Sequence, residues 1–322
     1  MNPFPMRPLA AAICLAAAAM PAAQAQSRYP EKSVRLIVPF APAGGTDISA
    51  RILAQKLSET MGHSFVVDNR PGAGSVLGTE IAARSPPDGY TIIQVAPEFT
   101  VNPSLQSKLP YDTLRDFTPI VRVVYGQYFM TVRRVVNINT VKDLIAATKT
   151  SQVTYGSSGT GSANHLAGEL FKTMAGVDMV HVPYKGSGPS MTALLAGEVT
   201  LTFGSSTAVI PHVKSGRAKV IAVTGPQRSA IAPDVPTVSE SGLPGFEVTG
   251  WYGLLGPARM PRAIVMRLNE QVNKVLPDLK ERYAEMGTEP AGGSPEQFAQ
   301  FIRTEIEKWS RVVKSSGAKP EG

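Results

Sequence analysis

The chain alternates between two kinds of hydrophobic pattern. Short continuous apolar runs, typical of buried strands, are separated by stretches whose apolar residues recur every three or four positions, as on one face of a helix. The runs that predict strands are residues 34–38, 65–67, 90–95, 121–124, 129–132, 153–155, 179–182, 199–203 and 219–223. Because strands and helices alternate, the pattern predicts an α/β fold with mostly parallel sheets flanked by helices.

Two predicted helices each begin directly after a glycine-rich turn. The first carries the apolar series Ile48, Ile52, Leu53, Leu57 and Met61, and the second carries Leu166, Leu170, Phe171 and Met174. Near the C-terminus, Ser294-Pro-Glu-Gln297 has the form of a capping box with proline at the first helical position. This motif predicts a helix through Trp309 whose apolar stripe packs against the core.

The N-terminal segment has the form of an export signal. A weakly basic stretch to Arg7 precedes an apolar, alanine-rich run over residues 9–20, and Ala23-Gln-Ala25 fits a small-x-small cleavage site. The run is shorter than the roughly 20 residues that a membrane span needs. We therefore predict cleavage after Ala25. Cys14, the one cysteine in the sequence, is then removed, so the mature chain has no disulfide.

Length and composition describe an exported globular protein with two domains. Removing 25 of the 322 residues leaves more chain than one core usually organises. Residues 226–250 are rich in proline, glycine and serine and predict a crossover between domains. No apolar stretch past residue 26 is long enough to span a bilayer. The net charge of +7 is scattered, with no aromatic-basic interleaving, so nucleic acid is not a predicted partner.

The two glycine-rich turns are the candidate binding elements in this sequence. They cover residues 40–47 and 156–162, each between a predicted strand and a predicted helix. The first backbone N–H groups of a helix have no partner within it, and the helix dipole favours negative charge there. If the turns face each other across a cleft, they predict a clamp for an anion.

Other chemistries lack the residues that they need. The glycine spacings do not match a dinucleotide fingerprint, and Tyr155-Gly-Ser-Ser-Gly-Thr-Gly161 contains no nucleophile elbow. Histidines 63, 165, 181 and 212 lack metal-site spacing. His165 lies in the first turn of the second helix, where a ligand contact and a local hydrogen-bonding role remain equal alternatives. We therefore predict neither an enzyme nor a cofactor.

Several motifs together resemble one protein family. They are Val38-Pro-Phe-Ala-Pro-Ala-Gly-Gly-Thr-Asp47, Asn69-Arg-Pro-Gly-Ala-Gly74, Tyr155 to Gly161 with His165-Leu-Ala-Gly-Glu-Leu-Phe171, Val182-Pro-Tyr-Lys-Gly186 and Gly250-Trp-Tyr-Gly253. In this order they resemble the Bug (Bordetella uptake gene) or TctC-type family, the extracytoplasmic solute-binding proteins of tripartite tricarboxylate transporters. The resemblance covers essentially the whole mature chain.

The resemblance implies a two-lobed periplasmic binding protein fold, type II-like, that closes on a small carboxylated solute. In this family the first lobe is built from both ends of the chain. Carried over, residues 1–25 are the signal peptide, 26–124 with 247–322 form the first lobe, and 125–246 form the second. The chain is then expected to cross between lobes near residues 121–129 and 246–252.

The resemblance also implies which residues hold the carboxylate. In the first turn they are Phe40, Ala41, Ala43, Gly44, Gly45, Thr46 and Asp47, and in the second they are Ser157, Ser158, Gly159, Thr160, Gly161, Ser162 and His165. Backbone N–H groups and hydroxyls are the suitable donors. An ionised Asp47 cannot donate, so capping the first helix is its expected role, with ligand contact as the alternative.

The chain departs from the family pattern at three places. Ala43 stands where many members carry glycine, and Gly204-Ser205-Ser206 stands where relatives often have aspartate. Gln94-Val-Ala-Pro-Glu98 replaces small, hydroxyl-rich residues. Gly204, Ser205 and Glu98 are expected to face the cleft. If the Glu98 carboxylate points into it, the side chain would repel a second acid group and attract an amine or hydroxyl; the alternative places Glu98 on the rim in water.

These observations predict a monomeric periplasmic protein, peripheral to the membrane. It would capture a small carboxylate between its lobes and deliver it to the large and small membrane subunits of a tripartite transporter. The alternative is a periplasmic sensor that presents the solute to a membrane sensor kinase, because both roles use the same trap.

Overall fold

The computed structural model describes residues 29–42, 44–106, 108–184 and 186–316. The predicted signal peptide, residues 1–25, and Ala43 lie outside this range. The strands are β1 (Val34–Val38), β2 (Phe65–Asn69), β3 (Thr91–Val95), β4 (Phe117–Arg133), β5 (Thr154–Ser157), β6 (Val180–Pro183), β7 (Leu201–Ser205), β8 (Ala218–Val223), β9 (Thr249–Pro257) and β10 (Glu289–Gly292). None of the helices in the described part of the chain is both long and apolar enough to cross a membrane.

Helices follow most of the strands. They are α2 (Gly45–Met61), α3 (Val76–Ala83), α4 (Glu98–Leu105), α5 (Val141–Ala147), α6 (Ala163–Ala175), α7 (Ser187–Ala196), α8 (Ser206–Lys214), α9 (Arg262–Val275), α10 (Lys280–Glu285) and α11 (Pro295–Ser316), with short 3-10 turns η1 (Ala73–Ser75) and η2 (Pro277–Leu279). The α/β fold class expected from the alternating pattern is confirmed.

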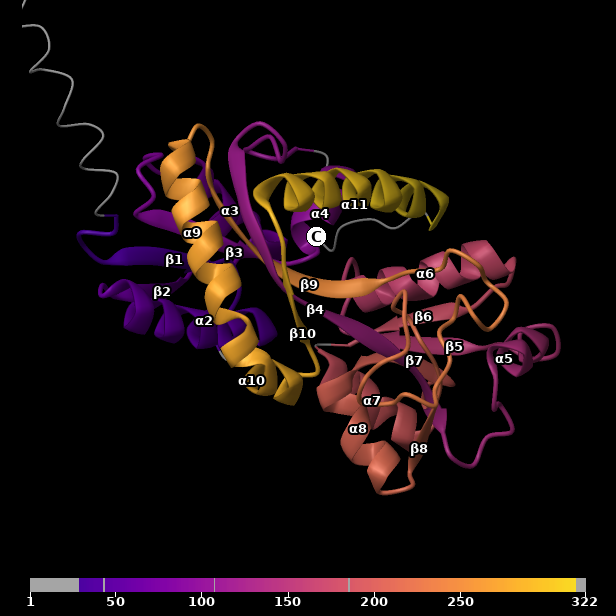
Figure 1. The fold of residues 1–322 in the computed structure, drawn as a ribbon. Coiled ribbons are helices and arrows are strands. Elements are labelled where there is room, and N and C mark those ends of the chain that lie inside the picture. Colours follow the sequence, from indigo (N-terminus) through magenta and orange to yellow (C-terminus); the bar gives the residue numbers. More distant parts are fainter. Residues whose placement is uncertain (1–28, 43, 107, 185, 317–322) are drawn as a thin grey trace, which may run out of the picture.

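The strands form two sheets that share β4. In the first sheet the order is β2-β1-β3-β9-β4, and β10 also pairs with β4. In the second sheet β4 continues into β7-β5-β6, and β8 also pairs with β4. The outer strands pair in parallel, whereas the shared β4 pairs antiparallel with its neighbours. Figure 1 shows the resulting two lobes, with the first on the indigo side and the second on the magenta side.

One long strand replaces the two that the pattern predicts over residues 121–124 and 129–132. Residues 125–128, which lie between the two predicted strands, stay extended because they continue the pairing of β4. They pair with β9 in the first sheet and then with β7 in the second. Gly126 and Gln127 pair with Gly250 and Thr249 of β9, whereas Tyr128 pairs with Ser205 of β7. The chain therefore passes from the first sheet to the second without a turn.

The sequence pattern does not predict β9 or β10. β9 contains three glycines and ends in proline, and β10 is Glu-Pro-Ala-Gly, a composition that disfavours strands. Both are strands because they pair along β4. The irregular segment predicted over residues 226–250 is found at residues 224–248, between β8 and β9.

Local capping sets where the main helices begin. Gly44, rather than Asp47, is the N-cap residue of α2. At α6 the Ser162 side chain is the N-cap acceptor for His165 N, 3.4 Å away. At α11 the predicted capping box forms in both directions, since Gln297 N donates to Ser294 Oγ and Ser294 N donates to Gln297 Oε1.

α11 joins the cores of the two lobes. Its first half packs Phe298 and Ile302 with Trp251 of the first sheet, and its second half places Trp309 and Val313 in the core of the second lobe. Figure 1 shows α11 running from one lobe to the other. The apolar stripe of this helix is therefore core, as its pattern indicates.

Candidate functional site

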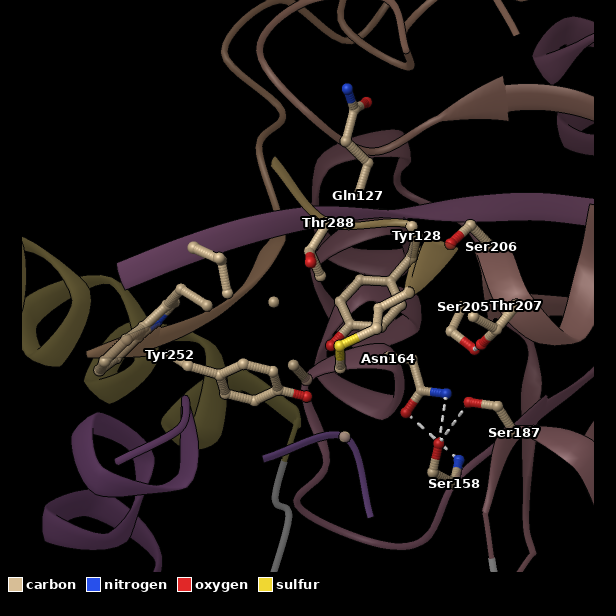
Figure 2. A pocket seen from close by; sticks show the side chains of 18 of the residues that line it. Gln127, Tyr128, Ser158, Asn164, Ser187, Ser205, Ser206, Thr207, Tyr252 and Thr288 are labelled. Atoms are coloured by element: carbon tan, nitrogen blue, oxygen red, sulfur yellow. Dashed lines mark hydrogen bonds between the residues drawn. The ribbon is translucent and has the colours of Figure 1, made fainter. Parts of the chain in front are cut away.

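A cavity of about 490 Å³ lies between the two lobes. Its walls come from both sheets near the point where β4 crosses, and from the helices that begin there. Figure 2 shows Tyr252 on one side and Asn164, Ser158, Ser187 and Ser205 on the other. The cavity is therefore a cleft between lobes, where small-molecule sites commonly occur.

Four helices from the two lobes reach this cleft with N-termini that place no acidic side chain in its lining. α2 contributes Gly45 from the first lobe. From the second lobe, α6 contributes Ser162 and Ala163, α7 contributes Ser187, and α8 contributes Ser206. First-turn N–H groups lack partners within their helix, and each helix dipole places partial positive charge at that end. This wall can hold an anion without a cationic side chain.

A hydrogen-bond network holds the polar wall of the second lobe in place. Asn164 accepts from Ser158 N at 3.2 Å and from Ser162 Oγ at 2.7 Å, and its Nδ2 donates to Ser158 Oγ at 2.8 Å. The hydroxyls of Ser158 and Ser187 are 3.0 Å apart. Figure 2 shows the bonds around Ser158 as dashed lines. These contacts pre-organise hydroxyls from two different segments around one corner of the cleft.

Two tyrosines also line the cleft. They are Tyr252 of β9 and Tyr128 of β4, and in Figure 2 Gln127 lies on the other face of β4 from Tyr128. Burial, followed by the nearby charge of Glu98, raises the pKa of Tyr252 to about 12, while its hydrogen bond with Thr46 acts the other way. Burial also raises the pKa of Tyr128. Both phenols are therefore neutral at physiological pH.

Glu98 is the first residue of α4 and lines the cleft. Its Oε2 has no contact with solvent and no hydrogen-bond partner among the described residues. Burial raises the pKa of this carboxyl. The alternative in which Glu98 stands in water on the rim therefore does not hold.

The buried Glu98 carboxyl predicts a pH-dependent stability difference. Below the ordinary value of 4.5 it is protonated in both folded and unfolded chains, so Glu98→Gln changes little. As the pH rises above 4.5, the unfolded chain releases this proton first, because the pKa of Glu98 is higher in the folded chain. The wild type therefore loses stability relative to the variant until the pH has passed the pKa of the folded chain. We expect urea unfolding to show Glu98→Gln as the more stable protein at neutral pH. A difference of the same size at all pH values would contradict this.

Of the residues predicted for the site, five line the cleft. They are Gly45, Glu98, Ser158, Ser162 and Ser205. The first-turn residues Phe40, Ala41, Gly44, Thr46 and Asp47 are not in its lining, and neither are Ser157, Gly159, Thr160, Gly161, His165 and Gly204. Ala43 lies outside the described residues.

Several of those residues form hydrogen bonds that hold the two turns in place without lining the cleft. Asp47 accepts from Arg51 Nε and from Asn69 Nδ2, which ties the first turn of α2 to the end of β2. His165 is buried, and its Nδ1 accepts from Gly161 N at 3.0 Å. Of the two alternatives for His165, the structure shows the local hydrogen-bonding one.

The sequence patterns do not single out most of the lining. The further residues are Ile48, Val124, Gly126, Gln127, Tyr128, Ala163, Asn164, Ser187, Ser206, Thr207, Gly250, Trp251, Tyr252, Met286, Gly287 and Thr288. One signal was available, because the motif Gly250-Trp-Tyr-Gly253 contains three of them. Ile48 also belongs to the predicted apolar stripe of α2, yet it is 42% exposed because it faces the cleft.

The fold and the cleft define a two-lobed solute-binding protein. The chain belongs to the family described as the tripartite tricarboxylate transporter family receptor (TctC), whose model matches residues 49–318. It is 34% identical to Protein BugT of Bordetella pertussis over 95% of this chain and 96% of that protein. It is 35% identical to a protein of Pseudomonas sp. over 90% of this chain and 88% of that one. The resemblance read from the motifs is therefore confirmed.

Solved structures agree with this assignment. A protein of R. palustris solved with adipate is 36% identical, with a TM-score of 0.79 over 91% of this chain and all of that one. The periplasmic binding protein BugD is 34% identical, with a TM-score of 0.75 over the same shares. MatC from Rhodopseudomonas palustris with bound malate is 29% identical, with a TM-score of 0.74 over 88% of this chain and all of that one. The family is one of transporter receptors and BugD is a periplasmic binding protein, so the chain belongs with substrate-binding proteins rather than enzymes, as predicted.

Proposed function

We propose that this protein captures a small carboxylate in the cleft between its lobes and delivers it to the membrane subunits of a tripartite transporter. The convergence of four helix N-termini on one cavity carries the proposal, because a carboxylate satisfies several first-turn N–H groups at once. The relatives solved with adipate and malate support the ligand class. The family match is to a transporter receptor, which favours transport over the sensor alternative.

The proposed division into lobes accompanies this function. Residues 26–124 with 247–322 would form one lobe and residues 125–246 the other, after cleavage of the signal peptide behind Ala25; the second half of α11 then extends from the first lobe into the core of the second. The crossings of β4 and β9 at Gln127 and Thr249 support hinge sites there. Binding that uses both lobes favours closure, since both sets of contacts form only in the closed state. We expect the mature protein to be a monomer. The intact mass of the exported protein tests the predicted cleavage after Ala25.

Binding of matched acids and amides tests the ligand class. Native mass spectrometry first identifies any small molecule that co-purifies, and the protein is then stripped of it by unfolding and refolding. Calorimetry compares succinate, glutarate, adipate and short mono-acids with the corresponding primary amides, which have the same shape without the charge. The proposal expects at least one acid to bind and its amide to bind far more weakly. Equal binding of acid and amide would overturn it, and so would failure of every carboxylate, amino acids included, to bind.

Gly45 offers a direct test that this cleft is the binding site. A Cβ at Gly45 would lie 2.4 Å from Tyr252 Oη, whereas at Gly44 the nearest atom would be Ala41 O at 3.6 Å. Overpacking of this kind costs about 1–3 kcal/mol. We expect Gly45→Ala to weaken binding of the acid found above about tenfold, and Gly44→Ala to leave it unchanged. Equal effects of the two variants would place the ligand elsewhere.

A further inference from the structure

The charge of the cleft is uneven. Among the described residues that line it, Glu98 is the one acid, and there is no lysine, arginine or histidine. α2, α6, α7 and α8 present N-termini without an acidic side chain in the lining, while α4 presents Glu98 at its first position. The cleft thus has one region suited to an anion and one point of negative charge.

One oxygen of the Glu98 carboxyl lacks a hydrogen-bond partner among the described residues. This oxygen, Oε2, is buried. The nearby groups that interact with it electrostatically are the phenols of Tyr128 and Tyr252, and neither is a cation. The backbone N–H of Glu98 interacts with the carboxyl, but a buried carboxylate with one oxygen left unpartnered is still costly, and a charged donor from the ligand would reduce that cost. The ligand is therefore the group in a position to complete the site.

We propose that Glu98 makes this cleft selective for a carboxylate that also carries an amine, in preference to a dicarboxylate of the same length. The inference rests on the proposed function, since the ligand's carboxylate would occupy the wall formed by α6, α7 and α8. Its ammonium group then pairs with the carboxylate of Glu98, a residue of the cleft lining, from the other end of the molecule. A second carboxylate in that place would meet a like charge in a poorly solvated position.

Ligand pairs of equal length separate charge from size. The pairs are succinate with 4-aminobutanoate, glutarate with 5-aminopentanoate, and adipate with 6-aminohexanoate, each titrated by calorimetry into stripped mature protein. The wild type is expected to bind the amino member of its best pair about tenfold or more tightly than the diacid. In Glu98→Gln this ratio is expected to fall about 10- to 100-fold, the range for a hydrogen bond between charged groups.

Glu296→Gln is the matched control. Glu296 also lies in the first turn of a helix, but its side chain is 61% exposed and pairs with Arg262 on the surface. The net charge changes by the same amount as in Glu98→Gln, and the loss of one exposed ion pair has little effect on stability. We expect its ligand ratio to equal that of the wild type. A shift as large as that of Glu98→Gln would assign the effect to overall charge and overturn the proposal.

Other outcomes are equally decisive. A wild type that binds the diacid at least as tightly as the amino acid overturns the role of Glu98 and leaves the proposed function intact. Diacid binding with proton uptake, seen in buffers of different ionisation enthalpy, also overturns it, because Glu98 would then act as a neutral donor. If Glu98→Gln does not fold, Glu98→Ser is measured instead. Failure of every carboxylate to bind overturns the proposed function and this inference with it.

Discussion

Replacing Gly287 with alanine is expected to weaken ligand binding about 10- to 100-fold by holding the lobes apart. Gly287 lies on the first lobe, between α10 and β10, and a Cβ there would be 1.2 Å from Ser206 Oγ and 2.4 Å from Ser206 Cβ. Ser206 is the first residue of α8 in the second lobe. A new rotamer of Ser206 would relieve the overlap with Oγ but not that with Cβ. Overpacking of about 1–3 kcal/mol corresponds to this loss of affinity.

Gly62 provides the matched control for this variant. Gly287 has φ of 68° and Gly62 has φ of 74°, so alanine is strained at both, but a Cβ at Gly62 has no atom within 4 Å. Gly62→Ala is therefore expected to lower stability without changing affinity. Adding Ser206→Gly to Gly287→Ala removes the overlapping atoms and is expected to restore binding relative to Ser206→Gly alone. Equal affinities for Gly62→Ala and Gly287→Ala would show that the contact does not govern closure.

The largest stability effect is expected at Trp309. Its side chain has no exposed surface, packs in the core of the second lobe and donates from Nε1 to Glu305 Oε2 at 2.9 Å. Truncation of a buried tryptophan to alanine costs about 3–5 kcal/mol. We expect Trp309→Ala to lower the free energy of unfolding by that amount in urea titrations followed by circular dichroism. The loss should spread to both lobes, because α11 packs in both cores.

Trp309→Phe separates the contribution of the buried ring from that of the hydrogen bond to Glu305. Phenylalanine keeps most of the buried ring but removes the N–H that serves Glu305, which is itself buried. We expect a loss smaller than that of Trp309→Ala. A Trp309→Ala protein as stable as the wild type would show that the end of α11 does not contribute to the core.

Features that depend on neighbouring residues could be predicted from the sequence. The capping box at Ser294 joins residues three apart, so its hydrogen bonds can be read from four letters. The start of α2 after Gly44 and of α6 after Ser162 likewise follows from local turn chemistry. These local signals placed two of the helix starts that reach the cleft.

The tyrosines that line the cleft could not be predicted in this way. Tyr252 lies on β9, whose glycines and proline argue against a strand, and β9 forms because β3 and β4 pair with it. His165 shows the same limit, since only the fold decides whether its ring meets a ligand or Gly161 N. The hydrophobic periodicity of a sequence does not show which distant segments pair or which side chains face the same cleft.

Local sequence thus sufficed for the alternation of strands and helices, the helix starts and the likeness to the TctC family, because each rests on short-range hydrogen bonding or on contiguous motifs. The tertiary structure decided that β4 runs unbroken through both sheets, that Gly287 meets Ser206, and that Glu98 has a buried, unpartnered oxygen in the cleft. These three features depend on which distant segments exclude water from one another, and that is set by the packing of the whole chain.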